Sequence, residues 1–423
     1  MLNLVYAAKD GSIIDEPSYY TVATTAEFDF VPPENDYIDI PNTSKIFYIP
    51  DSIPLGYNKK RMHIENIKKG NSLSAFLPPG YLRLYLPAYK RKEGSKYLPF
   101  YAYCHIAAKG DKLVVPAIKI DDDSKWNPAN YDFTPNFVNV VKPVLKKFEN
   151  NKIVNQLSKC ALEYGCTAAK NFFLGQYEAP IPTSNRCNCS CLGCISFSDR
   201  HLVVPHNRLT FTPTAKEIVE VALYHGDNEK DTLVSFGQGC EGDPIMVVDV
   251  ICKAVKEIKA KNKNITINFN SNCSKPEKIK QLIDAGIDSI RVTLFSADNY
   301  LYNVYHKPAD YSFEDVLKSL DIMSNSDVFL SLNLLVFPGI TDRLEEIKAL
   351  EKLLDNYRID LIQWRNLNID KYLLFDNIKL KKDEILGLKN LLKRLKRKYK
   401  HLQHGYFNRP KSQFYKELYK LSL

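Results

Sequence analysis

The chain has 423 residues, 45% of them hydrophobic, and a formal net charge of +9. This composition supports a buried core and excludes a disordered chain, and the length predicts a globular protein of more than one domain. No apolar run approaches the roughly 20 residues of a transmembrane helix, and the first residues lack the basic and apolar segments of a signal peptide. We therefore expect a cytoplasmic protein with no membrane partner.

Residues 1–140 predict an accessory domain that is mostly β. Short apolar runs such as 45–49 and 82–86 are separated by Pro and Gly, and helical periodicity is scarce. The run Phe76-Leu-Pro-Pro-Gly-Tyr81 predicts a turn, which either faces an active site or only punctuates a loop.

Residues 141–176 predict a connecting helix. After the pair Asn150-Asn151, apolar side chains recur at helical intervals from Ile153 to Tyr164. Cys160 and Cys166 lie on or beside this helix. A second metal cluster needs further partners from elsewhere in the chain, so we interpret both cysteines as packing residues.

Four of the ten cysteines lie within the eight residues from Cys187 to Cys194. Cys187, Cys191 and Cys194 have C-x3-C-x2-C spacing, and thiolates are soft ligands that suit iron–sulfur clusters. Three ligands on one short loop leave the fourth iron of a 4Fe–4S cube open to another molecule. Zinc is the alternative, but structural zinc usually takes a second, separated pair of ligands, and none follows. A disulfide cluster needs a secreted chain, which nothing in the sequence indicates.

From residue 177 to residue 375 the pattern alternates between strands and helices. Helices are expected to begin near Thr214, Ser274, Ser312 and Asp342, because each is followed three residues later by Glu or Asp. Such alternation predicts a parallel sheet, and six units form a partial (β/α)6 barrel of the TIM type, whose working end lies where the strands end. The expected strands are one before Cys187 and the segments 231–236, 265–269, 289–295, 328–336 and 361–366.

A glycine-rich segment, Phe236-Gly237-Gln-Gly239-Cys240-Glu241-Gly242-Asp243-Pro244, ends one of these strands. Glycines let the backbone approach a ligand closely. Polar side chains also lie at or after the ends of later strands, and together they predict a polar pocket.

The cysteine spacing and the glycine-rich segment together resemble the radical S-adenosylmethionine (radical SAM) superfamily over residues 177–375. The resemblance implies that Cys187, Cys191 and Cys194 hold a 4Fe–4S cluster whose open iron binds SAM. One electron, expected from a flavodoxin- or ferredoxin-type donor, then splits SAM into methionine and a 5′-deoxyadenosyl radical. One departure is Gly193, where members usually have an aromatic residue.

The resemblance also implies which residues contact SAM. Gly242-Asp243-Pro244 corresponds to the family's Gly-Glu-Pro sequence, which holds the SAM amino group, and Glu241 is expected to share that role. Asn270 corresponds to a position beside the ribose or methionine portion, and Thr293 and Ser296 correspond to positions near the carboxylate. The expected contacts are Gly237, Gly239, Glu241, Gly242, Asp243, Asn270, Thr293, Ser296 and Asn333; no catalytic residue is predicted.

Residues 376–423 predict a basic helical tail. They contain 14 Lys or Arg and 4 Asp or Glu, whereas the rest of the chain has 44 and 45. Leucines at 388, 392 and 395 form one apolar stripe. The tail is therefore expected either to dock on the barrel as a solvated amphipathic helix or to contact nucleic acid or an acidic substrate.

The sequence thus predicts a radical SAM enzyme of an anaerobic or low-oxygen cytoplasm. Its substrate is not determined by the sequence: RNA, a small metabolite and a peptide are all open. The alternative is a non-catalytic protein in which zinc or an Fe–S cluster organises an interaction platform for nucleic acid.

Overall fold

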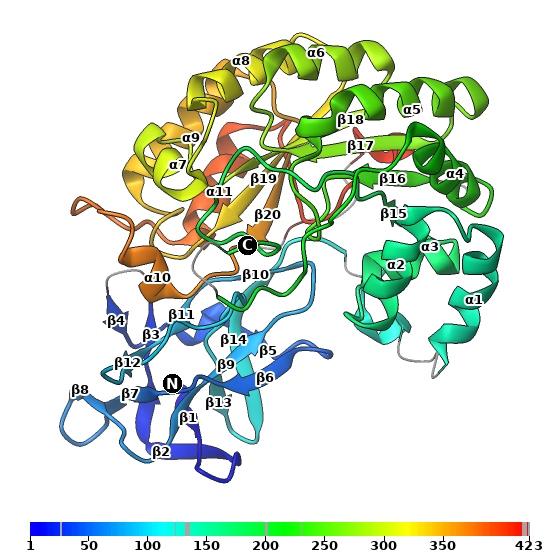
Figure 1. Ribbon diagram of the computed structural model, residues 1–423. Helices are drawn as coiled ribbons and strands as arrows, with labels where there is room; N and C mark the ends of the chain where they lie inside the picture. Colours follow the sequence, from blue (N-terminus) through cyan, green and yellow to red (C-terminus); the bar gives the residue numbers. More distant parts are fainter. Residues whose placement is uncertain are drawn as a thin grey trace.

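The computed structural model describes residues 1–25, 28–122, 124–131, 136–198, 202–229, 231–416 and 421. Figure 1 shows a β module, in blue and cyan, below a larger α/β lobe, with a small group of helices beside them. Among the described residues, no helix is both long and apolar enough to span a bilayer.

The N-terminal module consists mostly of antiparallel strands, as the sequence predicted. In its larger sheet β1 (Asn3–Ala7) pairs with β2 (Ile13–Thr21), β9 (Asn71–Phe76) and β13 (Ala107–Lys109). The remaining strands are β3 (Ala23–Thr24), β4 (Asp29–Phe30), β5 (Tyr37–Asp39), β6 (Lys45–Tyr48), β7 (Ser52–Asn58), β8 (His63–Asn66), β10 (Tyr81–Arg83), β11 (Leu86–Pro87), β12 (Tyr89–Arg91) and β14 (Lys112–Lys119).

The connector contains three helices among its described residues, where the sequence predicted one. They are α1 (Phe137–Lys147), α2 (Lys152–Leu162) and α3 (Thr167–Leu174). The side chain of Asn151 caps α2, because it accepts hydrogen bonds from the backbone N–H groups of Ile153 and Val154.

The α/β lobe is built on a curled parallel sheet, a half-barrel in which neighbouring strands follow chain order. All six predicted strands are present, and the described part of the sheet has a seventh strand that was not predicted. The strands are β15 (Glu178–Pro180), β16 (Leu233–Phe236), β17 (Thr266–Ser271), β18 (Ser289–Leu294), β19 (Phe329–Val336), β20 (Leu361–Asn366) and β21 (Gln403–Gly405). The helices are α4 (Ala215–Gly226), α5 (Val248–Lys261), α6 (Pro276–Ala285), α7 (Asn299–His306), α8 (Phe313–Ser324), α9 (Leu344–Asn356), α10 (Lys371–Phe375) and α11 (Leu388–Lys398).

The seventh strand, β21, comes from the basic tail. Its three residues include no apolar run, which is why periodicity did not reveal it. It pairs in parallel with β20 through Leu361 and Gln403, so the sheet continues beyond the boundary that the sequence suggested at residue 375.

Two of the four expected helix starts are confirmed as capping boxes, Thr214 with Glu217 and Ser312 with Asp315. The other two were wrong by one residue. Lys275 and Arg343 are the N-caps of α6 and α9, without side-chain capping bonds. Asp342 is used elsewhere, because its carboxylate accepts the backbone N–H of Gly339 at 2.6 Å.

The β module is fixed against the mouth of the half-barrel by a buried arginine. Arg83 on β10 donates to the carbonyls of Tyr103 at 3.1 Å and Leu367 at 2.8 Å. Asn366 at the end of β20 completes the contact, since it accepts from the Arg83 backbone and donates to the Tyr81 carbonyl. These bonds hold the turn that follows β9 over the strand ends.

The tail docks on the α/β lobe through α11. Its leucines are buried in the same core as the barrel strands. Arg394 forms two hydrogen bonds with the carboxylate of Glu351, at 2.7 and 2.8 Å, and Lys398 contacts Asp355 at 3.0 Å. Several of the tail's charges therefore face acidic partners in this chain.

Because α11 contributes to the barrel core, Leu392→Ala should lower the free energy of unfolding by about 2–5 kcal/mol, the usual cost of removing a buried leucine. Leu392 is fully buried, whereas the adjacent Lys393 is exposed, so Lys393→Ala is the matched control. Urea unfolding followed by circular dichroism measures both. Equal unfolding midpoints would show that the helix contributes nothing to the stability of the lobe.

Candidate active site at the cysteine loop

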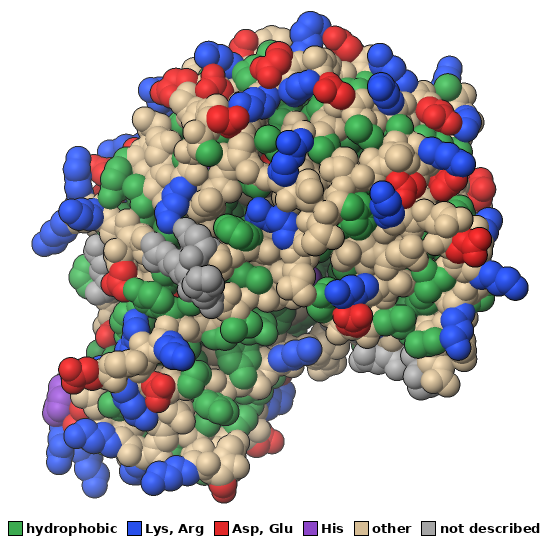
Figure 2. Space-filling view, in the orientation of Figure 1, with side chains coloured by type: hydrophobic (Ala, Val, Ile, Leu, Met, Phe, Trp, Pro, Cys, Tyr) green, Lys and Arg blue, Asp and Glu red, His purple; other side chains and the backbone are tan. Residues whose placement is uncertain are grey.

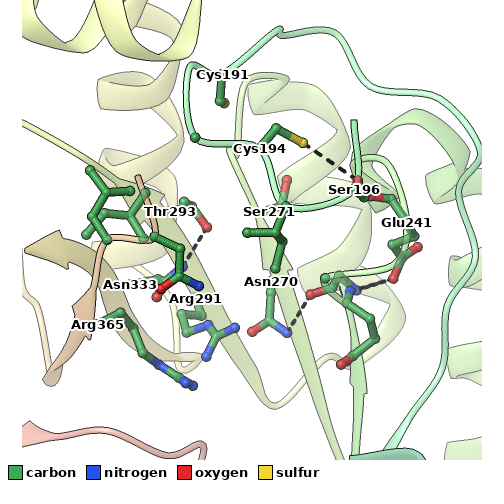
Figure 3. A pocket seen from close by; sticks show the side chains of 18 of the residues that line it. Cys191, Cys194, Ser196, Glu241, Asn270, Ser271, Arg291, Thr293, Asn333 and Arg365 are labelled. Carbon is green, nitrogen blue, oxygen red and sulfur yellow. Dashed lines mark hydrogen bonds between the residues drawn. The ribbon is translucent and has the colours of Figure 1, made fainter. Parts of the chain in front are cut away.

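A cavity of about 530 Å³ lies where the barrel strands end (Figure 3). It is bordered by the cysteine loop (residues 187–194), the glycine loop (residues 237–243) and the ends of β17–β20. The β module closes one side with Phe76, Leu77 and Pro79, so the turn predicted over residues 76–81 does face this cavity. The volume falls within the range of about 300–1,000 Å³ that small-molecule sites usually have.

All four thiols of the cysteine loop are half-buried and border the cavity. Cys189 Sγ lies 3.4 Å from Cys187 Sγ and 3.6 Å from Cys191 Sγ. The pKa of Cys187 is raised, mainly by its hydrogen bond to Cys189 and next by burial. Closely spaced thiolates repel one another unless a cation compensates their charge. This soft, crowded donor set fits a metal cluster. Among the described residues, no three His, Cys, Asp or Glu side chains are grouped around a single-ion position.

His306, at the end of α7, contacts the cysteine loop and was not predicted. Its Nδ1 lies 3.3 Å from Cys191 Sγ, and its Nε2 accepts the backbone N–H of Phe295. Because Nε2 accepts, the proton of the neutral ring lies on Nδ1 and faces the sulfur. Burial lowers the pKa of His306 to about 3. No local motif signals this residue, since it lies 115 positions from Cys191.

Two further residues beside the cysteine loop were also missed. Arg208 Nη2 lies 3.5 Å from Cys194 Sγ, where its charge favours a thiolate. A Cβ on Gly193 would lie 2.9 Å from the hydroxyl of Tyr305. The aromatic ring next to this loop therefore comes from α7 rather than from position 193.

Glu241 holds the glycine loop and the cysteine loop together. One carboxylate oxygen accepts from the backbone N–H groups of Gly237 and Gln238, at 2.9 and 2.6 Å. The other accepts from the N–H groups of Thr183 and Ser184, at 2.7 and 2.8 Å, and from the Thr183 hydroxyl. Burial raises the pKa of Glu241 to about 7, and these bonds oppose the rise. Both oxygens are thus committed to protein donors rather than to a ligand.

Asp243 is similarly committed to the protein. Its carboxylate accepts from the Ser271 hydroxyl at 2.6 Å and from the backbone N–H of Asn272 at 2.7 Å. Burial raises its pKa. The adjacent Gly242 packs on the cysteine loop so closely that a Cβ would lie 2.0 Å from the Arg186 carbonyl oxygen. The segment predicted to bind SAM through its acids therefore positions the two loops.

The other polar residues predicted at strand ends divide into two groups. Asn270, Thr293 and Asn333 line the cavity, as do Gly237 and Gly239. Asn333 donates to the Thr293 hydroxyl at 3.1 Å, and Asn270 donates to the Phe236 carbonyl at 2.6 Å. Ser296 does not line it, because its buried hydroxyl donates to Glu346 at 2.6 Å, outside the cavity wall.

Cys160 and Cys240 lie outside the cavity wall. They share a hydrogen bond, which lowers the pKa of Cys160 to about 7 and, together with burial, raises that of Cys240. Both belong to the barrel core, in agreement with a packing role for Cys160.

These site features agree with comparisons with known proteins. Residues 181–353 match the family model described as the Radical SAM superfamily. An uncharacterized protein from Methanocaldococcus jannaschii is 26% identical over 187 residues, which cover 44% of this chain and 56% of that protein. The match thus spans just over half the length of this curated relative.

Solved structures also resemble parts of the chain. Methylornithine synthase (PylB) has a TM-score of 0.38 and 16% identity, over 60% of this chain and 76% of its own. TsrM from Kitasatospora setae, a radical SAM methyltransferase solved with cobalamin and a 4Fe–4S cluster bound, has a TM-score of 0.34 and 14% identity, over 44% of this chain and 36% of its own. Another TsrM structure holds a SAM analogue.

The residues matched by the Radical SAM superfamily model hold the cysteine loop, the glycine loop and strands β16–β19. The match confirms the resemblance inferred from the cysteine spacing. The β module, the whole connector and the tail lie outside the matched residues.

The role of Glu241 can be tested by Glu241→Gln. The amide nitrogen places a donor against backbone N–H groups, and each buried group that loses its acceptor costs about 1–3 kcal/mol. We expect a loss of at least that size in unfolding free energy, measured by urea denaturation. Glu277→Gln, at an exposed site on α6, is the control. If the two variants unfold at the same urea concentration, the hydrogen bonds of Glu241 do not stabilise the contact between the glycine loop and the cysteine loop.

Proposed function

We propose that this protein is a radical SAM enzyme in which Cys187, Cys191 and Cys194 hold a 4Fe–4S cluster and SAM binds beside it. The observation that carries the proposal is that the thiols of the cysteine loop and the polar ends of β17–β19 border the same cavity. With an electron from a flavodoxin- or ferredoxin-type donor, the cluster held by these cysteines and the SAM beside it would supply radical chemistry, the reductive cleavage of SAM to a 5′-deoxyadenosyl radical, for hydrogen-atom removal from the substrate.

Cys189 is proposed to stand next to the cluster without ligating it. Only one residue separates Cys189 from Cys187, and only one separates it from Cys191. The loop would be strained if Cys189 and one of these neighbours both bound the cluster. Its backbone forms an isolated bridge with Pro308, and its sulfur faces the amide of Asn272 at 3.7 Å. These contacts supply other partners for Cys189 than a metal.

SAM is proposed to lie between the glycine loop and the strand ends. Thr293 and Asn333 present side-chain polar groups there, and Gly237 and Gly239 let backbone approach the ligand. Glu241 and Asp243 act indirectly, by fixing the loops in place. Ser296 is not included, because it lies outside the cavity wall.

A small metabolite is proposed as the substrate in preference to RNA. On the face in Figure 2, basic and acidic side chains are interspersed over the α/β lobe. The tail, which carries the excess charge, pairs Lys389, Arg394 and Lys398 with acidic residues of this chain. A low-oxygen cytoplasm remains the proposed setting, because an exposed iron in such a cluster reacts with oxygen.

Cysteine variants test the proposal directly. Cys187→Ala, Cys191→Ala and Cys194→Ala should each abolish the iron–sulfur absorbance and all 5′-deoxyadenosine formation, because each removes one of three ligands. Cys189→Ala should keep both. Iron and sulfide analysis after anaerobic reconstitution, with chromatography of 5′-deoxyadenosine after reduction, measures these outcomes.

The same variants distinguish the alternatives. Bound zinc without sulfide would support the non-catalytic platform instead. Failure of the Cys189 variant to take up iron, with uptake by one of the other three, would show that the ligands are assigned wrongly.

A second test concerns His306. A hydrogen bond from its Nδ1–H to the Cys191 sulfur stabilises the more negative, reduced cluster, so it raises the reduction potential. His306→Phe keeps a ring against Tyr302 but removes the donor. We expect the potential to fall by on the order of 50 mV, since 59 mV corresponds to a tenfold change for one electron.

Anaerobic redox titration by electron paramagnetic resonance measures this shift, with Tyr302→Phe as the ring-packing control. An unchanged potential in a variant that still binds its full complement of iron would show that His306 only packs against the loop.

A further inference from the structure

Two arginines lie side by side in the part of the cavity remote from the cysteine loop. Figure 3 shows Arg291, from β18, and Arg365, from β20, on the side opposite Cys191 and Cys194. Both guanidinium groups donate to one neutral oxygen, Gln363 Oε1, at 2.6 Å from Arg291 and 3.4 Å from Arg365. Two like charges are therefore held close together around a single acceptor.

Neither arginine forms an ion pair within 4.0 Å among the described residues. The carboxylate whose charge reaches Arg291 is that of Glu178, and it already accepts hydrogen bonds from Ser235 and Asn408. The Nε atoms of both arginines are buried without a hydrogen-bond partner. Most of their donors are thus uncommitted to the protein.

This arrangement costs free energy unless an anion compensates it. Both arginines are half-buried. A charge partly removed from water without a counter-ion is unfavourable, and a second charge of the same sign adds repulsion. Burial and the neighbouring Arg365 lower the pKa of Arg291 to about 9, which reflects both effects. The ring of Tyr406 lies 4.1 Å from Arg365 and offsets only part of this cost.

We infer that Arg291 and Arg365 form the binding site for an anionic group of the substrate, a carboxylate or a phosphate. Guanidinium forks bind both groups bidentately. The inference rests on the proposed function and narrows its substrate to a small acid. The carboxylate of SAM is not the expected occupant, because the proposed cluster site lies across the cavity and the family's open iron binds that carboxylate.

The remaining walls of this site suit a small molecule. Trp126 and Phe407 stack with ring centroids 5.6 Å apart and border the cavity next to Tyr406. Asn408 is held in place, because it accepts from Gln363 at 2.9 Å and donates to Glu178 at 2.7 Å. The cavity must also admit SAM, so about 530 Å³ leaves room for a compact substrate only.

Titration calorimetry of the iron-loaded protein tests the inference, with inorganic phosphate and malonate as probes and SAM titrated separately. At least one anion should bind, and Arg291→Gln and Arg365→Gln should each weaken it by about tenfold or more, the effect of losing a charge-assisted hydrogen bond. SAM affinity should stay within about twofold. The anion that binds more tightly identifies the substrate group as phosphate or carboxylate.

Arg397→Gln, at an exposed position on α11, is the control for loss of one positive charge. Arg365→Lys is the second variant in case the glutamine variants unfold; it retains the charge but loses the fork, and should weaken malonate binding. Binding that is absent, or unchanged in both glutamine variants, overturns the inference. So does a loss of SAM affinity equal to the loss of anion affinity, which would assign the pair to SAM.

The outcomes separate this inference from the proposed function. Arginine-dependent anion binding in a protein that takes up no iron would retain the anion site and reject the radical SAM chemistry. Normal cluster uptake and 5′-deoxyadenosine formation without arginine-dependent anion binding would support the radical SAM chemistry and reject the anion site.

Discussion

The site depends on one buried carboxylate. Glu241 receives hydrogen bonds from the segment before the cysteine loop and from the glycine loop, while its own carbonyl accepts the hydroxyl of Ser196 beyond that loop. One residue therefore fixes both ends of the cysteine loop against β16. Burial of this carboxylate costs free energy of desolvation. The five hydrogen bonds that it accepts offset this cost, because their donors would otherwise lack partners. Cluster ligands on a short loop need such support, since the loop has no regular structure of its own.

The middle of the cysteine loop is held from the other side. Asn188 donates to Ser274 and Asp310, both at 2.9 Å, and accepts from Asn272 at 2.8 Å. The loop is thus tied to the end of β17 and to the segment between α7 and α8. With His306 contacting Cys191, the cysteines are positioned by residues from three separate strand–helix units. Preorganised ligands of this kind keep their geometry without the metal having to impose it.

Features with a local signal could be predicted from the sequence. Strand β20 was predicted with its observed bounds, and the capping boxes at Thr214 and Ser312 were identified, because apolar periodicity and caps act over a few residues. Strand β21 was not predicted, since its three residues contain no apolar run and form a strand only through pairing with β20. The contact of His306 with Cys191 was also not predicted, because only tertiary packing brings the two residues together.

The candidate site shows the same division. Cysteine and glycine spacing located both loops, but spacing does not determine which direction a carboxylate faces. Glu241 and Asp243 resembled ligand-binding acids and instead accept backbone N–H groups. Ser296 lies two residues after the end of β18, and its hydroxyl meets Glu346 instead of the cavity. Which side of the wall a residue occupies depends on sheet curvature, which periodicity does not report.

The interior of the half-barrel is lined by polar side chains, as expected for a site that holds a ligand. TIM-type barrels are usually filled by branched apolar side chains, but here Asn270, Arg291, Thr293 and Asn333 point inward. Such a lining is stable only when its polar groups find partners. The soft sulfur donors of the cysteine loop lie on one side of the cavity, and the guanidinium groups of Arg291 and Arg365 lie on the other (Figure 3). Sulfur donors suit a metal cluster, whereas guanidinium groups attract an anion. A ligand held at the metal and an anion held at the arginines would therefore occupy different ends of the cavity, with their remaining parts adjacent between them.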